Sequence, residues 1–502
     1  MTETEPAAGE ALGPDRDVLA LQRMESAVVR ADFANPGTIA SRDVRRLRYL
    51  LSMARLETFE PGAALRGGRT GRGDVNVGAA VAGFRARVLE ELALPLRGEP
   101  DPVERLRRAR PVLERLAAHV PEVRAAALAA AASVSPAELD AEIERRVLVS
   151  VAGGGGGAGY VYIGAYRSLE QDGIVPGFVI GSSIGALLGM FRARTVKAPW
   201  DEYIALAHGI DRRELFSAAS LRRRFGLPGL LALRLRGVLG AAFTDDSGLP
   251  LRISDLEIPF EAVVAGVRSR SYERLPDRFR HDVTAPSSEP TARFSLPRLA
   301  PAVATRMWQV AAFFDPRVVK PIVLGADDAT AALNAIDAAG FSAAIPGVLH
   351  YEPAREDGRT SQILGDLFER EQVSALVDGG VASNVPADLA WKAIRAGRIG
   401  TRNAFLLAFD CFHPQWEPRH LWLQPITQAV QIQMQRNAPF ADWIIRFEPT
   451  LSPANLVPTP KRLDEAIGWG REVIERELPL IRRFLEPVSW DDAGREMASS
   501  SP

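Results

Sequence analysis

Cysteine, histidine and long apolar runs are scarce in this 502-residue chain, which has one cysteine (Cys411) and six histidines. One cysteine excludes an internal disulfide framework and a metal site of clustered cysteines. The histidines show no HxxxH or HExxH spacing, so we expect no metal site. No run reaches the roughly 18 apolar residues of a membrane-spanning helix, and the acidic start MTETEPAAGEALGPD lacks the apolar core of a secretory signal. We therefore expect a cytoplasmic protein.

An excess of charge of one sign is also missing. Lys and Arg number 61 and Asp and Glu 62, a formal net charge of -1. This balance argues against a protein that coats nucleic acid, so we expect no nucleic-acid partner. At roughly 100–200 residues per domain, the length suggests about two to four structural units, and 47% apolar residues is ordinary for a globular chain.

The patterns along the chain predict four regions. The N-terminal 1–40 is acidic and is expected to be disordered. Residues 41–146 read as helical, because Asp101-Pro102 and Ser135-Pro136 each place an N-cap residue before a proline. The spacing of apolar residues changes at Val147, where a catalytic α/β region over 147–485 is expected to begin. We expect 486–502 to be a flexible tail.

The α/β region opens with alternating strand and helix signals. The apolar run VLVSVA ends in glycines, as a buried parallel strand does. A helix, a second strand and a second helix follow at 160–173, 177–181 and 183–194, and further strands are expected at 259–266, 319–324, 374–377 and 404–409. A βαβα order predicts an α/β fold.

A G-x-S-x-G motif follows the second expected strand, from Gly181 through Ser183 to Gly185. In a nucleophile elbow, the glycines permit a strained turn that projects the serine oxygen into a cleft beside a helix N-terminus. The motif alone is weak in a chain with 42 glycines, but its place between a strand and a helix is the one the elbow requires. We interpret Ser183 as the candidate nucleophile; the alternative is an inert serine in a tight turn.

A glycine-rich loop, GGGGGAG at 153–159, follows the first expected strand. Gly154, Gly156 and Gly159 fit G-x-G-x-x-G, which would bind the pyrophosphate of a dinucleotide at a helix N-terminus. That site also needs an acidic residue at the tip of the next strand, and 180–183 has none. An oxyanion hole of backbone N–H groups is favoured over a nucleotide site such as that of an NAD-linked oxidoreductase, because neighbouring parallel strands end in one crevice.

The sequence marks no histidine as the base that the serine would need. His350 and His413 lie beside strand-like runs, but a lone histidine there is more often structural. Asp378 ends an apolar run and is followed by Gly379 and Gly380, which allow a close approach to another backbone. Taken alone, the Asp-Gly pair is more typical of a turn.

Several segments carry patterns that occur together in one family. They are VSVAGGGGGAGYVYIGAYRSLEQDGI (149–174), VIGSSIGALLG (179–189), SAAIPGV (342–348) and LVDGGVASNVPADLA (376–390). In this order and spacing they resemble the first strand, glycine loop and helix, the elbow and the aspartate segment of the patatin-like phospholipases. The resemblance covers about 146–480, and 200–340 is only loosely similar.

The resemblance implies a three-layer α/β/α sandwich with a mainly parallel sheet, preceded here by the helical region. It implies a Ser–Asp dyad, with Ser183 as nucleophile and Asp378 as base. It also implies hydrolysis of fatty-acyl esters, commonly of phospholipids, through an acyl-enzyme without a cofactor. The oxyanion donors would be Gly154, Gly155, Gly156 and Gly157. The family loop usually carries Arg or Lys where this chain has Ala158, so any electrostatic contribution of that cation is absent.

The segment 212–240 combines seven arginines and one acidic residue with many Leu and Phe residues. This composition predicts a basic amphipathic surface in which Arg222, Arg223 and Arg224 meet lipid phosphates while Phe216, Phe225 and the leucines enter the acyl layer. An equally supported interpretation is a cap packed on the enzyme's own core. The leading prediction is thus a lipid acyl hydrolase with peripheral membrane contact; the alternative is a catalytically silent α/β module that binds an acyl chain or a nucleotide.

Overall fold

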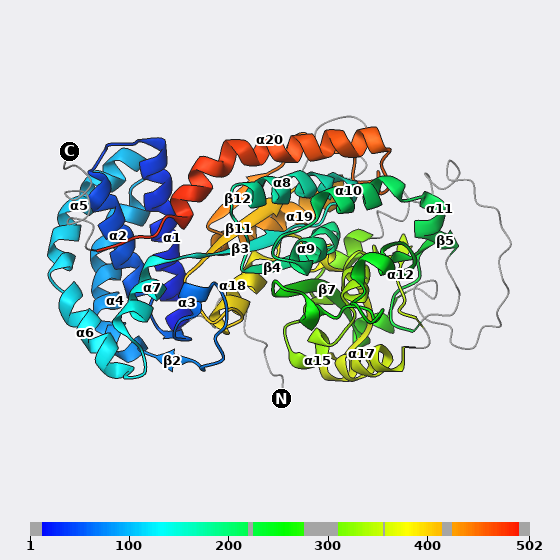
Figure 1. Cartoon of the computed structure of the whole chain (residues 1–502), viewed down its shortest axis with the longest axis horizontal. Coiled ribbons are helices and arrows are strands. Elements are labelled where there is room, and N and C mark those ends of the chain that lie inside the picture. The colour runs from blue at the N-terminus through cyan, green and yellow to red at the C-terminus, as the bar shows by residue number, and fades with distance from the viewer. Residues whose placement is uncertain (1–12, 219–223, 276–309, 355–356, 414–423, 491–502) are drawn as a thin grey trace. The chain divides into compact units, whose positions relative to one another are not determined.

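A computed structural model describes residues 13–218, 224–275, 310–354, 357–413 and 424–490 (Figure 1). The chain divides into two compact units. The helical unit comprises Met1–Leu148, Lys392–Phe405 and Glu477–Pro502, and the sheet unit comprises Val149–Trp391 and Leu406–Arg476. No described helix is long and apolar enough to cross a membrane.

The helical unit is built on six helices: α1 (Gly13–Ala34), α2 (Ser41–Ala54), α4 (Gly78–Ala93), α5 (Pro102–Ala117), α6 (Val120–Ala130) and α7 (Pro136–Glu144). Two of the predicted starts are present with their caps. The Asp101 side chain accepts the Val103 N–H at the start of α5, and Ser135 forms a capping box with Glu138 at the start of α7. A two-residue ladder, β1 (Thr58–Phe59) with β2 (Val75–Asn76), joins the loops between them.

Helix α1 corrects the prediction that 1–40 is disordered. Leu21, Met24 and Val28 recur at helical spacing and are fully buried in the core of the helical unit. The acidic composition of the first residues hid this apolar stripe. Residues 1–12 lie outside the described part of the chain.

Two segments from far along the chain, 392–405 and 477–502, complete the helical unit. The prediction differs here, because it assigned all of 147–485 to the catalytic region. The Arg48 guanidinium donates to the carbonyl oxygens of Arg483, Phe484 and Glu486. Val488 is buried, and Trp490 packs on Tyr49 with 5.4 Å between ring centroids. The predicted flexible tail is therefore ordered as far as 490, because its apolar residues have partners in the helical unit.

The sheet unit is built on a seven-stranded sheet, in which β7 pairs with β4, β8 and β10 and the pairing continues from β4 to β3, β11 and β12. The strands are β3 (Val147–Ala152), β4 (Phe178–Ser182), β7 (Phe260–Arg268), β8 (Val319–Leu324), β10 (Val373–Asp378), β11 (Ala404–Asp410) and β12 (Trp443–Arg446). The pairs β3/β4, β4/β7 and β11/β12 are parallel, whereas β8 and β10 run antiparallel to β7. All six predicted strands are present, and β12 was not predicted.

Strand β7 aligns the ends of two other strands. Ser182 of β4 pairs with Val263, and Asp378 of β10 pairs with the next residue, Val264. Since β8 pairs with both valines, β4 and β10 must share the opposite edge of β7. Their carboxyl ends therefore meet head to head at adjacent positions of one strand.

Helices lie on both sides of the strands, with α8 (Val161–Gln171) and α20 (Pro460–Leu485) on one side and α18 (Ala387–Arg395) on the other (Figure 1). Helices α8 and α20 approach closely through glycine, because a side chain at Gly164 would lie 1.9 Å from the Ile467 carbonyl oxygen. The predicted three-layer α/β/α sandwich with a mainly parallel sheet is confirmed.

Candidate active site

Ser183 occupies a strained turn between β4 and α9 (Ile184–Arg194). Its φ of 54° and ψ of -125° lie in a region that L-residues rarely adopt. The turn needs glycine on both sides, since a side chain at Gly181 would lie 2.5 Å from Gly185 and one at Gly185 would lie 2.2 Å from the Ala152 carbonyl oxygen. The predicted elbow geometry is therefore present, with the α9 N-terminus directly after the serine.

Ser342 anchors this turn, a contact that the sequence did not reveal. It ends α16 (Ala335–Ser342), and its hydroxyl accepts the Ser183 N–H at 2.8 Å and donates to the Val263 carbonyl at 2.6 Å. The elbow is thus tied to the strand that aligns β4 and β10. Ser342 is the first residue of the segment SAAIPGV, so the family resemblance was the only available signal.

Asp378 lies beside Ser183. The Ser183 hydroxyl donates to Asp378 Oδ2 at 2.7 Å, and the Gly380 N–H donates to Oδ1, also at 2.7 Å. Burial raises the pKa of Asp378 to about 6, although these two hydrogen bonds oppose the rise. Gly379 must lack a side chain, because one would lie 2.0 Å from the Val263 carbonyl oxygen. The arrangement provides a carboxylate that can accept a proton near neutral pH.

The glycine loop approaches the serine from the end of β3. A side chain at Gly154 would lie 3.0 Å from Ser183 Cβ, so the loop backbone borders the nucleophile. The Gly154 N–H donates to the Asn384 carbonyl and the Gly157 N–H to that of Pro453. These two predicted donors are engaged, whereas the N–H groups of Gly155 and Gly156 have no acceptor among the described residues. Gly155 and Gly156 are therefore the candidate oxyanion donors.

Ala158 and Gly159 face the protein interior. Ala158 is fully buried and its N–H donates to the Gly155 carbonyl. A side chain at Gly159 would lie 2.4 Å from Ile184 on the neighbouring helix. A long cation in place of Ala158 would have to displace this packing, which gives a local physical reason for the departure from the family pattern.

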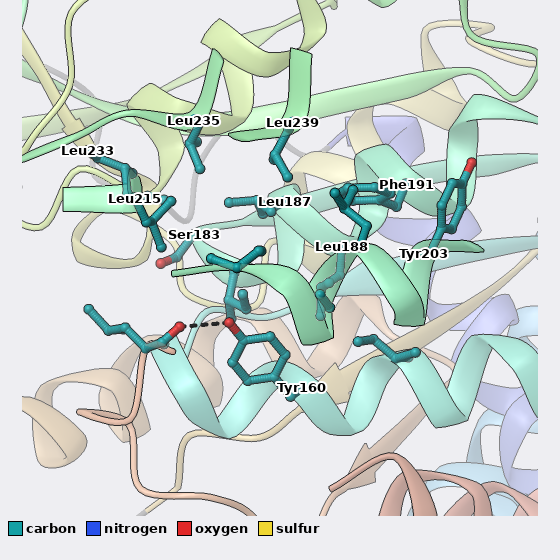
Figure 2. Close-up of a pocket in the computed structure, with 18 of the residues that line it drawn as sticks. Tyr160, Ser183, Leu187, Leu188, Phe191, Tyr203, Leu215, Leu233, Leu235 and Leu239 are labelled. Carbon is teal, nitrogen blue, oxygen red and sulfur yellow. Dashed lines mark hydrogen bonds between the residues drawn. The ribbon is translucent and has the colours of Figure 1, made fainter. Parts of the chain in front are cut away.

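An apolar pocket opens beside Ser183 and Gly156 (Figure 2). Its empty space is about 1040 Å³ when the open mouth is counted. Helix α9 contributes Leu187 and Phe191, and α10 (Trp200–Gly209) contributes Tyr203. As far as the described residues show, no charged side chain lines it. Such a pocket suits a hydrocarbon chain.

The segment 212–240 forms much of the remaining wall through α11 (Arg212–Leu215), β5 (Phe216–Ala218), β6 (Leu231–Leu233) and α12 (Leu235–Leu239). Phe225 is 4% exposed and packs edge-on against Phe368. Phe225 and the pocket-facing leucines (Leu215, Leu233, Leu235 and Leu239) are therefore not free to enter a lipid layer, which corrects that part of the prediction. Arg224 is exposed, while Arg222 and Arg223 lie outside the described residues.

The two histidines considered as bases have other contacts. His350 Nδ1 lies 2.8 Å from the Leu227 carbonyl, and its Nε2 lies 3.6 Å from Glu352. His413 Nε2 lies 3.9 Å from Glu448. Within the described ranges, no group of three or more His, Cys, Asp or Glu side chains could hold a metal ion.

The fold and the residues beside the pocket define an α/β/α protein with a serine elbow facing a buried carboxylate. Residues 150–391 match the family model of the patatin-like phospholipases. The chain thus carries a patatin-like phospholipase domain, which confirms the resemblance, and the family implies lipid acyl hydrolase activity. The match spans the glycine loop, the elbow and Asp378. No curated protein matches the chain significantly.

Proposed function

We propose that the chain is a phospholipase A-type serine acyl hydrolase, with Ser183 as nucleophile and Asp378 as general base. The observation that carries this proposal is the 2.7 Å hydrogen bond from Ser183 Oγ to Asp378 Oδ2, beside a pocket that Ser183 lines and whose described lining is uncharged. A strained turn and a buried carboxylate with a raised pKa support it. Both features lower the stability of the fold, and such features cluster at functional sites.

In the first half-reaction, Asp378 Oδ2 accepts the hydroxyl proton while Ser183 Oγ bonds to the acyl carbon. The carbonyl oxygen becomes an oxyanion, which the N–H groups of Gly155 and Gly156 and the α9 N-terminus stabilise. The bond to the alcohol oxygen then breaks, and Asp378 returns the proton to that oxygen. The products are a free alcohol and an acyl-enzyme on Ser183.

In the second half-reaction, a water molecule gives a proton to Asp378 as its oxygen attacks the acyl carbon. The bond to Ser183 Oγ breaks, and the proton passes from Asp378 to Oγ. The fatty acid leaves and the resting dyad is restored. No histidine is needed, since one carboxylate handles the proton in both halves.

A fluorophosphonate probe tests the assignment, because only an activated serine reacts with it. We expect labelling of the wild type, none of Ser183→Ala, and nearly normal labelling of Ser182→Ala, the adjacent serine. An unlabelled wild type would favour the silent binding module. Labelling that is lost in Ser182→Ala but kept in Ser183→Ala would refute Ser183 as nucleophile.

We also propose peripheral contact with anionic membranes through Arg222, Arg223 and Arg224. Since Phe225 and the pocket-facing leucines of this segment are buried, the contact would rest on charge. Salt should weaken it, because exposed charges further apart than a Debye length, about 10 Å at 0.1 M, are largely screened. Reversing the three charges should lower hydrolysis of anionic vesicles and leave a soluble short-chain ester unaffected. Equal loss on both substrates would indicate damage to the cap, and loss on neither would exclude these arginines as the docking site.

A further inference from the structure

The pocket runs along one face of α9, away from Ser183. Ser183, Leu187 and Phe191 follow one another at intervals of four residues, so they lie on the same face of the helix. Figure 2 shows the same progression, with Ser183 at one side, Leu187 and Leu188 further along, and Phe191 and Tyr203 beyond them. At ~1.5 Å per helical residue, the backbone of Phe191 lies about 12 Å from that of Ser183.

Aromatic rings stand at the far end. Phe191 packs edge-on against Tyr203 and Phe243, with 4.9 Å between the centroids of each pair. Trp200 packs edge-on against Tyr203 at 6.0 Å. All four rings are at most 8% exposed. Interlocked buried rings yield little to an incoming chain, because close-packed interiors resist displacement.

The length of this channel sets the length of chain that it can hold. An extended chain advances about 1.2 Å per bond, since the three backbone bonds of a residue span at most ~3.6 Å. Helical side chains lean toward the N-terminus, so the Phe191 ring reaches back toward Ser183 and shortens the available 12 Å distance. The full distance of about 12 Å corresponds to about ten bonds and the ring takes up part of it, so about eight to ten carbons is the most that fits between the nucleophile and the rings.

We propose that the pocket selects esters of a single unbranched acyl chain of about eight to ten carbons, with Phe191 as the residue that sets the limit. The catalytic part rests on the proposed function. The alcohol part of the ester would remain outside, because the described lining offers no charged group to a headgroup. Leu235 and Leu239 of α12 line the same pocket as Leu187 (Figure 2) and add to its apolar lining.

p-Nitrophenyl esters of about four to sixteen carbons, all presented in the same non-ionic detergent so that the longer ones stay dispersed, test the limit. For the wild type, kcat/KM should rise about fourfold per added carbon and stop rising near eight to ten carbons. Leu187→Phe places a ring about half-way along the channel and should move this break shorter by at least about two carbons. Phe191→Ala should move it longer. Leu249→Phe, on a leucine that is 60% exposed, is the control and should leave the profile unchanged.

Calorimetric binding of free fatty acids of the same lengths separates the two proposals. Fatty acids that bind with a break near eight to ten carbons, without hydrolysis of any ester, would support the pocket assignment and contradict the proposed function. Affinity and kcat/KM that keep rising beyond about twelve carbons in the wild type would overturn the length limit. So would a break that stays in place in Leu187→Phe, the variant that decides the question if Phe191→Ala does not fold.

Discussion

Each unit of the molecule buries a carboxylate, and the two carboxylates have opposite surroundings. Glu25, in the helical unit, is 1% exposed. It forms ion pairs with Arg48, Arg55 and Arg146. Burial alone would raise the pKa of Glu25, but the three arginines outweigh burial and lower it to about 2. Glu25 is therefore ionised at any physiological pH.

Asp378, in the sheet unit, is buried almost as deeply at 5% exposed, but among the described residues it accepts only the Ser183 hydroxyl and the Gly380 N–H. Burial dominates, and the pKa rises to about 6. The charge of Glu25 stabilises the fold above its unfolded pKa, and this stability is lost as the pH falls toward 2. Ionisation of Asp378 destabilises the fold as the pH rises through 6, but the ionised carboxylate provides a proton acceptor.

Removing the acceptor from the sheet unit should have the largest effect. Asp378→Asn keeps the shape but cannot take the Ser183 proton, so we expect acylation to slow by about 10²–10⁴-fold. Stability should be unchanged or higher, because the buried charge is gone. Single-turnover ester hydrolysis measures the rate, with His350→Ala and His413→Ala as controls that lose little. A histidine variant as impaired as Asp378→Asn would contradict the dyad.

Neutralising the other carboxylate should reverse this outcome. Glu25→Gln removes the negative charge that Arg48, Arg55 and Arg146 share, and should lower the free energy of unfolding by about 3–5 kcal/mol. Denaturant titration at neutral pH measures it. Activity per folded molecule should stay near the wild-type value, since Glu25 is not in the sheet unit. A large loss of activity in fully folded Glu25→Gln would break the division between structural and catalytic carboxylates.

The sequence predicted the sheet and the elbow because their signals are local. A buried strand followed by glycines is visible in VLVSVA, and the Gly181–Gly185 spacing describes the turn itself. Contacts made by distant segments had no such signal. Nothing near Ser342 indicates that its hydroxyl holds the Ser183 N–H, 159 residues away. The composition of 212–240 described its polarity but not that Phe225 has Phe368 as a partner.

The pH profile sharpens the comparison further. Since the pKa of Asp378 is raised to about 6, kcat/KM for a soluble ester should fall about tenfold per unit below pH 6 and level off above it. The pKa that this profile gives for the free enzyme should therefore be that of Asp378 and not that of Glu25. A plateau that persists to pH 4 would mean that Asp378 stays ionised and that its surroundings resemble those of Glu25.

A third buried carboxylate, Glu142, tests whether the pKa of such a group depends on the structural unit that it belongs to or on its immediate surroundings. It belongs to the helical unit, like Glu25, but its Oε1 accepts the Arg402 N–H while its buried Oε2 has no hydrogen-bond partner among the described residues. Burial raises the pKa of Glu142 to about 7, against an ordinary value of 4.5. By its surroundings, then, it resembles Asp378.

A group with a raised folded pKa contributes stability that is complete below its unfolded pKa and is lost as the pH rises through the folded value. For Glu142 this window runs from about 4.5 to about 7. Glu142→Gln cannot ionise, so between pH 5 and 8 we expect the wild type to lose about 1–3 kcal/mol more stability than the variant does. Denaturant midpoints at both pH values measure the difference, and the titration of other groups cancels between the two proteins. Equal losses would mean that Glu142 ionises as it does in the unfolded chain, and surroundings alone would then not explain the contrast between Glu25 and Asp378.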